Sequence, residues 1–563
     1  MAALKFFLLC LVSIFNQQTS VSASQSDQVL WAFPKSDKEA DILRNLTTAF
    51  EIVLWQPVSP ENIVKNKEVH FYVNVSDVDD VKAELNRSAI LFRIALEDVQ
   101  KIIDLQTVND TVTPRSSISF YEQYHSLKVI YTWMDEIAAR YPAIIQKIHI
   151  GHSFDKRPLY VLKLSGRSRT PKNAIWIDCG IHAREWVSPA CCLWFIGHVT
   201  QFLNRDVTMA GLLQNLDFYV MPIMNVDGYE YTWTTNRMWR KSRSQHGYNK
   251  CTGTDMNRNF DAGWCGKGGS RDDCQETYCG PYPESEPEVK AVADFLRKHK
   301  DRVKAYLTMH SYSQMVLFPY SYTKNKSKDH DELQLVANQV TNAIRNTYHN
   351  RYVAGSGAQT IYLAPGGSDD WAYDHGIKYS FTFELRDRGR YGFLLPQHLI
   401  KPTCYEAITG IKIIASHLEE REKEERERGE KEKEREKTEK KRERERKERG
   451  GEEKEEKGRE RKRKRKEKER GRGKRKRRKR KKIEKGERKE KERGKRKLEE
   501  REKEREIRER GKRKRTEKEK KREEREEREK EEREERERER GKERKKKERK
   551  GERKEKKRKE KKD

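Results

Sequence analysis

The sequence contains no apolar run long enough to cross a membrane. A transmembrane helix needs about 20 consecutive apolar residues, and the early run Phe6–Phe15 is much shorter. Lys5 precedes this run and the small residues Val21-Ser22-Ala23 follow it, which is the pattern of a cleavable secretory signal. We therefore expect a signal peptide over residues 1–23 and a secreted, extracellular product with no membrane span.

Apolar side chains are also almost missing from residue 421 onward. Up to residue 562, every position is Glu, Lys, Arg or Gly except Thr438, Ile483, Leu498, Ile507 and Thr516. No core can form from this composition, so residues 419–563 are expected to be a disordered or solitary-helix tail. Residues 421–563 hold 79 Lys+Arg and 48 Asp+Glu, which accounts for +31 of the total net charge of +32. The basic charge therefore says nothing about the partners of the remaining chain.

The tail has more than one explanation. Its run Lys474–Lys482 could bind polyanions or act as a nuclear signal, but an export signal argues against the nuclear role. Glu, Lys, Arg and Gly all have codons built only from purines. We therefore also hypothesise that the tail is a purine repeat translated past the true end of the protein.

Cysteines are few, and all but Cys10 lie after residue 178. In an exported protein most of the other eight are expected to form disulfides, and sequence alone permits 105 full pairings of eight. Cys251–Cys279 holds four of them and predicts a stapled loop, because the spacing lacks the paired C-x-x-C motifs of a zinc ribbon. Export is also supported by five N-glycosylation sequons, at Asn45, Asn74, Asn86, Asn109 and Asn325.

Residues 24–115 contain no cluster of His, Cys and carboxylates at ligand spacing. Their apolar patterns predict the order βαββαβ, a small antiparallel sheet with two helices on one face. We interpret this unit as a binding or folding module. It ends in a polar stretch where Pro114 resists a helix and Arg115 suits a trypsin-like protease. This predicts zymogen cleavage after Arg115, with an ordinary linker arginine as the alternative.

Residues 116–418 alternate β-rich runs with helical patterns and predict an α/β domain with a mainly buried sheet. The stretch Ile175–Pro189, I-W-I-D-C-G-I-H-A-R-E-W-V-S-P, carries His182 and Glu185 three residues apart after a strand. A helix is predicted to follow the cap Ser188. One imidazole and one carboxylate at this spacing suit zinc with a distant third ligand, although a bare His-x-x-Glu is more often structural.

Further polar residues stand at the predicted ends of other strands and in loops. His310 closes A-Y-L-T-M-H, Glu384 lies in F-T-F-E-L-R-D, and two loops carry N-R-M-W-R and D-M-N-R-N. A zinc hydrolase needs a third ligand, a general base and an oxyanion stabiliser. An exopeptidase also needs a cation for the terminal carboxylate of its substrate. Each group alone can be interpreted as capping or surface charge, and their co-occurrence favours a hydrolase.

Six motifs in order resemble the zinc metallocarboxypeptidases of the pancreatic A/B type: I-H-A-R-E-W, N-R-M-W-R-K, G-T-D-M-N-R-N-F, H-S-Y-S-Q, I-Y-L-A-P-G-G-S-D-D-W and F-T-F-E-L-R-D. The resemblance covers about residues 24–418. It implies a mixed central sheet flanked by helices, preceded by a small α+β propeptide that caps the cleft. The expected domains are a signal peptide (1–23), an activation propeptide (24–115), a zinc carboxypeptidase domain (116–418) and the charged tail (419–563).

The resemblance also implies a role for each site residue. The ligands of one zinc ion per chain would be His182, Glu185 and His310. Asp255 would orient His182, Glu384 would be the general base and Arg240 would stabilise the oxyanion. The substrate's terminal carboxylate would bind Asn257, Arg258 and Tyr362. The neighbouring subsites would be lined by Arg184, Arg237, Ser311 and Tyr312.

Specificity, activation and crosslinks follow from the same resemblance. Asp369 falls in the side-chain pocket and implies a preference for C-terminal Lys or Arg. A trypsin-like protease such as thrombin would release the propeptide after Arg115. The family's disulfides correspond to Cys179–Cys192, Cys251–Cys274 and Cys265–Cys279. Cys191 and Cys404 are left over, and the Cys191-Cys192 doublet leaves the first pairing open by one residue.

Three functions compete for the chain as a whole. We favour a secreted zymogen of a carboxypeptidase that acts on peptides or proteins ending in Lys or Arg. An A-type carboxypeptidase with an apolar preference would differ in its relative rates on C-terminal Arg and Phe. A polyanion-binding protein acting through its basic tail would show salt-sensitive retention on heparin.

Overall fold

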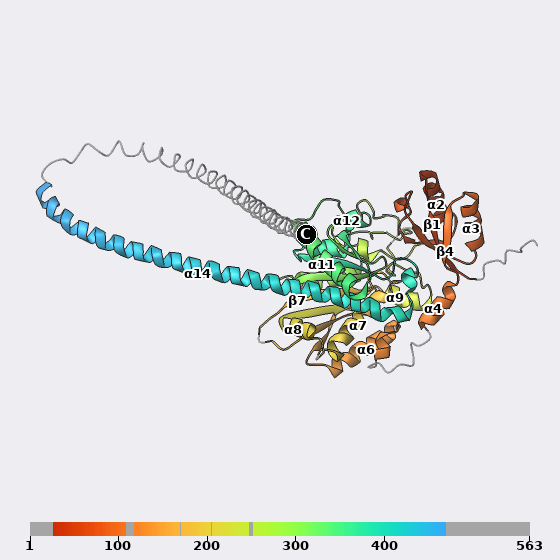
Figure 1. Cartoon of the computed structure of the whole chain (residues 1–563), viewed down its shortest axis with the longest axis horizontal. Coiled ribbons are helices and arrows are strands. Elements are labelled where there is room, and N and C mark those ends of the chain that lie inside the picture. Colours follow the sequence, from red (N-terminus) through yellow and green to blue (C-terminus); the bar gives the residue numbers. More distant parts are fainter. Residues whose placement is uncertain (1–25, 108–117, 169, 204, 247–250, 469–563) are drawn as a thin grey trace, which may run out of the picture. The chain divides into compact units, whose positions relative to one another are not determined.

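The computed structural model describes residues 26–107, 118–168, 170–203, 205–246 and 251–468, with side chains up to residue 444 (Figure 1). The predicted signal peptide, Asn109, Arg115 and the run Lys474–Lys482 lie outside these residues. The chain divides into two compact units, residues 1–434 and 435–563. The first unit contains all the elements that build the candidate site.

The described part of the chain begins with the small α+β domain that the sequence predicts. Its elements are β1 (Gln28–Phe33), α2 (Asp37–Ala49), β2 (Ile52–Gln56), η1 (Pro60–Asn62), β3 (Val69–Val73), α3 (Val78–Arg87), β4 (Leu91–Leu96) and α4 (Val99–Thr107). The strands pair antiparallel in the order β2-β3-β1-β4. Side chains alternate along β1, so Leu30 and Ala32 join the core with α2 and α3. Val29 and Trp31 point the other way and pack against the larger domain.

The larger domain is built on an eight-stranded sheet in the order β11-β10-β12-β9-β7-β8-β6-β5. Its strands are β5 (Ile145–His152), β6 (Pro158–Ser165), β7 (Asn173–Cys179), β8 (Leu216–Met221), β9 (Val303–Ser311), β10 (Met315–Phe318), β11 (Val353–Ser356) and β12 (Tyr379–Leu385). The central strands β12, β9, β7 and β8 are parallel, whereas β5, β6 and β10 pair antiparallel with their inner neighbours. This confirms the mixed sheet, and the carboxyl ends of its parallel strands meet at one edge.

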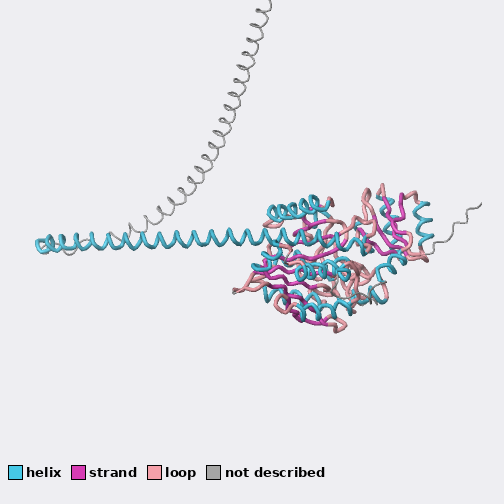
Figure 2. Tube along the Cα trace, turned by 60° about the horizontal axis from the view of Figure 1, so that its bottom comes forward, coloured by secondary structure: helices cyan, strands magenta, loops and turns pink. Residues whose placement is uncertain are grey.

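Helices surround the strands of this domain (Figure 2). They are α5 (Ile118–Tyr121), α6 (Leu127–Arg140), α7 (Val187–Gln201), α8 (Val207–Asn215), α9 (Val226–Thr234), η2 (Met256–Arg258), α10 (Pro287–His299), α11 (His330–Tyr348), α12 (Gly357–Thr360), α13 (Ser368–Asp374), η3 (Gly392–Leu394), η4 (Gln397–Leu399) and α14 (Ile400–Lys468). None of the helices over the described residues combines the length and apolar content needed to cross a bilayer. Helix α14 contributes buried residues to the core up to Leu418, and its helical backbone continues into the charged sequence.

The prediction that Ser188 caps the helix after the His-x-x-Glu turn is wrong. Helix α7 begins at Val187, and Ser188 lies fully buried inside its first turn. The Ser188 hydroxyl instead accepts a hydrogen bond from the Gly180 N–H at 3.0 Å and donates one to the Met309 carbonyl at 2.5 Å. The Ser188 hydroxyl therefore bonds distant segments of the chain and does not cap the helix, although the local sequence pattern predicts capping.

Four disulfides crosslink the larger domain: Cys179–Cys192, Cys251–Cys274, Cys265–Cys279 and Cys191–Cys404. The first three are the pairs that the family resemblance implies. The fourth joins the two cysteines that the resemblance left over, so that α7 is tied to α14. The two cysteines are 213 residues apart in the sequence, and both are buried.

Replacing Cys191 and Cys404 together by alanine should lower the free energy of unfolding by about 5 kcal/mol, because a crosslink that closes a long loop removes much entropy from the unfolded chain. The matched control replaces Cys251 and Cys274, which are 23 residues apart, and should lose only about 3 kcal/mol. Denaturant unfolding under non-reducing conditions measures both losses. An equal or smaller loss for the Cys191–Cys404 pair would contradict the prediction.

Candidate active site

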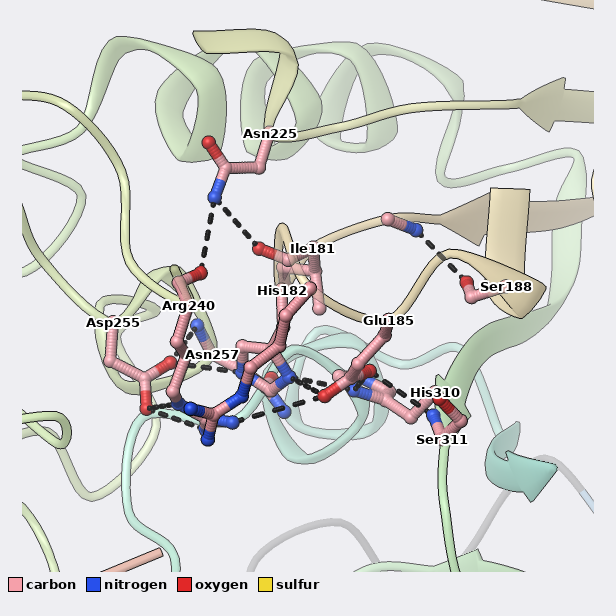
Figure 3. A network of polar contacts seen from close by, with 12 residues as sticks. Ile181, His182, Glu185, Ser188, Asn225, Arg240, Asp255, Asn257, His310 and Ser311 are labelled. Carbon is pink, nitrogen blue, oxygen red and sulfur yellow. Dashed lines mark hydrogen bonds and ion pairs between the residues drawn. The ribbon is translucent and has the colours of Figure 1, made fainter. Parts of the chain in front are cut away.

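The turn after β7 brings His182 and Glu185 to the carboxyl end of the parallel strands (Figure 3). Gly180 has a φ of +64°, and a Cβ there would lie 3.0 Å from the Pro189 ring, so the turn needs glycine. The Asn225 amide donates to the carbonyls of Ile181 at 3.3 Å and Arg240 at 3.4 Å. The turn is thereby tied to the loop that carries Arg240.

His182, Glu185 and His310 form a compact donor cluster. One ligand atom from each lies within 4.8 Å of the others, and all three side chains are buried. Nδ1 of His182 lies 2.7 Å from Glu185 Oε1, and Nδ1 of His310 lies 3.1 Å from both His182 Nδ1 and Glu185 Oε2. Two imidazole nitrogens and one carboxylate thus converge, which is a donor set suited to zinc.

One other cluster with metal-ligand chemistry occurs in the described chain, at Cys251, Asp273 and Cys274. Its two cysteines are bonded to each other, so their sulfur atoms are not thiolate ligands. The predicted stapled loop therefore carries no zinc ribbon. Of the two clusters, the one formed by His182, Glu185 and His310 has side chains that can bind zinc.

The protonation of this cluster also fits a cation. Burial would raise the pKa of Glu185, but the neighbouring His182 and His310 outweigh it and hold the pKa below its ordinary value. Burial would lower the pKa of His310, yet Glu185 and then Glu384 raise it to about 9. His310 therefore carries a proton, and its positive charge faces the carboxylate of Glu185. A divalent cation would replace that proton on binding.

Asp255 connects three parts of the site. Its Oδ1 lies 3.1 Å from His182 Nε2, and its Oδ2 accepts from Arg240 Nη2 at 2.8 Å and Nε at 3.2 Å. Its side chain also accepts from the Asn257 N–H at 3.0 Å, which caps η2. Burial opposes the charge, but Arg240, Arg258 and His182 keep the Asp255 pKa well below its ordinary value.

The sheet register explains why His310 and Glu384 meet. Glu384 on β12 pairs directly with His310 on the parallel strand β9. Because directly paired residues of neighbouring strands project from the same face, both side chains reach the same space. Burial, opposed by His310 and supported by Glu185, raises the pKa of Glu384 to about 8.

A cavity of about 90 Å³ lies beside this cluster. Its lining includes most of the site residues expected from the sequence, namely His182, Glu185, Arg240, Asn257, Arg258, His310, Ser311, Tyr312, Tyr362, Asp369 and Glu384. Asp369 is only 4% exposed, and burial raises its pKa. The structure therefore brings a buried carboxylate into the same cavity as the donor cluster.

Arg184 and Arg237 are not among the residues that line the cavity. Arg184 is fully buried and donates at 3.3 Å to the carbonyls of Leu54 and Met238. Arg237 donates to the carbonyls of Arg184 at 2.8 Å and Phe393 at 2.7 Å, and both its Nε and Nη2 reach the Gln106 side-chain oxygen at 3.3 Å. Residues of the small domain thus occupy part of the surroundings of both arginines.

The small domain also contributes to the cavity wall. Trp55, Gln56, Pro57 and Val58, at and after the end of β2, line it. The family resemblance implies that the small domain caps the cleft. Sequence patterns predict β2 but do not show that its end is the part that reaches the cavity, because that contact depends on how the domains pack. Leu317, Ser321 and Gly357, which also line the cavity, were missed because each is an ordinary strand or turn residue by sequence.

Replacing Asp255 by asparagine should weaken zinc binding about 10–100-fold, because a carboxylate that orients a ligating histidine is lost. Competition with a chromophoric chelator measures the affinity, and the unaltered protein should hold one zinc per chain. The control is Glu276→Gln, which removes a carboxylate from Arg184. Equal affinities of the two variants would contradict the orienting role.

Comparisons with known proteins agree with this site. The family described as zinc carboxypeptidase matches residues 130–410, and the family described as carboxypeptidase activation peptide matches residues 30–106. The chain is 60% identical to carboxypeptidase B2 of Rattus norvegicus over 410 residues, which covers 72% of this chain and 97% of the relative. Carboxypeptidase B2 of Homo sapiens is 59% identical, with 72% and 96% covered.

A solved structure is similar along the same part of the chain. The crystal structure of thrombin activatable fibrinolysis inhibitor matches with a TM-score of 0.69 and 58% identity, and the match covers 70% of this chain and 98% of that chain. The matched lengths span both the small domain and the domain that carries the donor cluster. The protein therefore belongs to the zinc carboxypeptidase family, in the form that begins with an activation peptide.

Proposed function

We propose that the protein is the secreted zymogen of a carboxypeptidase that removes C-terminal Arg or Lys from peptides and proteins. The observation that carries this proposal is the buried carboxylate of Asp369 in the cavity that His182, Glu185 and His310 also line. A carboxylate binds a guanidinium or ammonium group strongly when water is excluded. An apolar residue at this position would favour a substrate ending in Phe or Leu.

The residues beside the donor cluster suit peptide hydrolysis. Zinc held by His182, Glu185 and His310 would supply Lewis acidity that activates water and polarises the scissile carbonyl. Glu384, whose pKa is raised to about 8 by burial, would take a proton from the attacking water and pass it to the leaving amine. Arg240, whose Nη1 lies 3.8 Å from Glu185 Oε1, would stabilise the negative charge on the carbonyl oxygen.

The substrate's terminal carboxylate would bind Arg258, Asn257 and Tyr362, which line the same cavity. Arg258 is 2% exposed, and its Nε has no hydrogen-bond partner among the described residues. This donor is available to a carboxylate, with Asn257 and Tyr362 beside it in the lining. A substrate held there and at Asp369 would present its last peptide bond to the donor cluster. Ser311 and Tyr312 would contact the substrate residue that precedes the C-terminal one.

We further propose that residues 24–115 are an activation peptide, released by cleavage after Arg115, and that residues 116–418 are the enzyme. Trp55 to Val58 occupy space in the cavity lining, and the Leu54 carbonyl accepts from Arg184. Gln106 holds Arg237 in the same way. A substrate would have to displace these contacts, so removing the small domain frees Arg184 and Arg237 for the neighbouring subsites.

The setting of the enzyme is also part of the proposal. Export fits the disulfides and the predicted sequons, at Asn45, Asn74, Asn86 and Asn109 in the small domain and the linker after it. The name of the solved relative describes activation by thrombin and inhibition of fibrinolysis. We therefore propose thrombin as the activating protease and plasma substrates such as partly degraded fibrin. The tail, with its run Lys474–Lys482, is proposed to bind polyanions if it forms part of the product.

Replacing Asp369 by isoleucine should lower kcat/KM for C-terminal Arg at least about 100-fold, because the substrate cation loses its buried partner. The kcat/KM for C-terminal Phe should change less than about tenfold, because an apolar side chain has no charge that needs the Asp369 carboxylate as a partner. The assay uses protein activated with trypsin, with and without a zinc chelator. Equal losses on both substrates would contradict the assignment of Asp369, and activity that resists the chelator would contradict the proposed chemistry.

His70 on β3 lies where the small domain meets the enzyme. It is 2% exposed, its Nδ1 lies 2.9 Å from the Tyr312 hydroxyl, and its ring stacks on Trp31 with centroids 4.1 Å apart. Burial lowers the pKa of His70 below its ordinary 6.5, Arg93 acts in the same direction, and Glu68 and Asp387 act against it. The docked domain therefore favours the neutral imidazole.

Acid should loosen the small domain. Because the pKa of His70 is lowered in the docked state, its contribution to docking is present above pH 6.5 and is lost as the pH falls below that value. An Arg115→Gln protein keeps the domain attached. The ratio of its activity on a short peptide to that of the activated enzyme should rise as the pH is lowered from 7.5 to 5.5. Adding His70→Gln should remove this rise. A rise of the same size in both proteins would contradict the role of His70.

A further inference from the structure

One sequon lies in the enzyme rather than in the small domain or the linker after it. Asn325-Lys326-Ser327 belongs to the loop between β10 and α11. Asn325 is exposed, and its backbone N–H donates to the Thr323 hydroxyl at 3.2 Å. Its side-chain amide makes no hydrogen bond with any residue that the structure describes. The amide nitrogen is therefore free to carry a covalent group without disturbing the fold.

The same loop contributes Ser321 to the cavity wall. Ser321, at its start, lines the cavity, and its N–H and that of Tyr322 donate to the carboxylate of Asp370, which neighbours Asp369. The Lys324 carbonyl accepts from the side chain of Gln359 at 3.1 Å. Gln359 lies in α12, whose first residue, Gly357, is also part of the lining.

Asn325 is close in sequence to a residue that lines the cavity. It is four residues from Ser321, a separation that the chain can span with at most about 14 Å. A large group on Asn325 would be attached within that distance of the cavity lining, and it would be retained after cleavage at Arg115. The sequons at Asn45, Asn74, Asn86 and Asn109 all precede Arg115 and leave with the activation peptide.

We propose that Asn325 carries an N-linked oligosaccharide, and that this sugar restricts access of folded proteins to the cavity while short peptides pass. The transfer forms a bond from Asn325 Nδ2 to C1 of the first sugar. It breaks the bond from C1 to the pyrophosphate oxygen of a lipid-linked oligosaccharide, and the amide proton leaves to a base. The selectivity rests on the proposed function, whereas the modification does not.

Occupancy is tested on full-length protein secreted from eukaryotic cells. Enzymatic deglycosylation in H₂¹⁸O should convert Asn325 to labelled aspartate, read by mass spectrometry in a chymotryptic peptide, because trypsin cuts this lysine-rich loop too finely. Asn325→Gln and Ser327→Ala should each abolish the label. Lys326→Arg, which keeps the sequon and the ion pair with Asp331, should retain it. An unlabelled Asn325 in a sample whose Asn45 is labelled would overturn the proposal.

Selectivity is tested by comparing trypsin-activated Asn325→Gln and Lys326→Arg enzymes. Their kcat/KM values on a short peptide ending in Arg should agree, and this assay reports the proposed function itself. On a folded protein ending in Arg, the Asn325→Gln enzyme should be faster by at least about twofold, because fewer orientations of the substrate are blocked. Equal rates on the folded protein would overturn the screening role even if Asn325 is glycosylated.

Discussion

The buried carboxylate of Asp255 holds the active site together. Removing a carboxylate from water costs several kcal/mol unless partners compensate, and here Arg240, His182 and a backbone N–H all do so. Each partner is positioned in return. His182 turns its other nitrogen toward Glu185 and His310, and Arg240 keeps its charge beside the cluster. Asp255 also caps η2, the short helix that carries Asn257 and Arg258.

The parallel strands deliver the other groups to this carboxylate. Strand β7 leads to His182 and Glu185, while β9 ends with His310 beside Glu384 on β12. Sequence patterns could predict this arrangement because buried parallel strands are apolar runs, and polar residues at their ends stand out against them. The family motifs then linked residues that are more than 120 positions apart.

Other features could not be predicted because they depend on packing between distant segments. The Ser188 hydroxyl is local in the sequence, yet its partners are Gly180 and Met309. The Cys191–Cys404 bond requires α7 and α14 to lie side by side, which no spacing rule encodes. The placement of Trp55 in the cavity lining depends on how a separate domain docks. For the charged tail, composition limits the structure to a helix or disorder, and the helix is observed through Lys468.

The alternating faces of β1 have a consequence for the enzyme after activation. One face packs on the small domain's own helices, and the other joins an apolar cluster shared with the enzyme. The shared cluster comprises, among others, Val29, Trp31, Trp55, Met238, Tyr312, Phe393 and Leu394. Separation of the domains uncovers both halves of it, and exposed apolar patches promote association between molecules. The contact that joins the two domains in the precursor would thus become a surface for self-association, and the active enzyme would be lost faster at higher concentration.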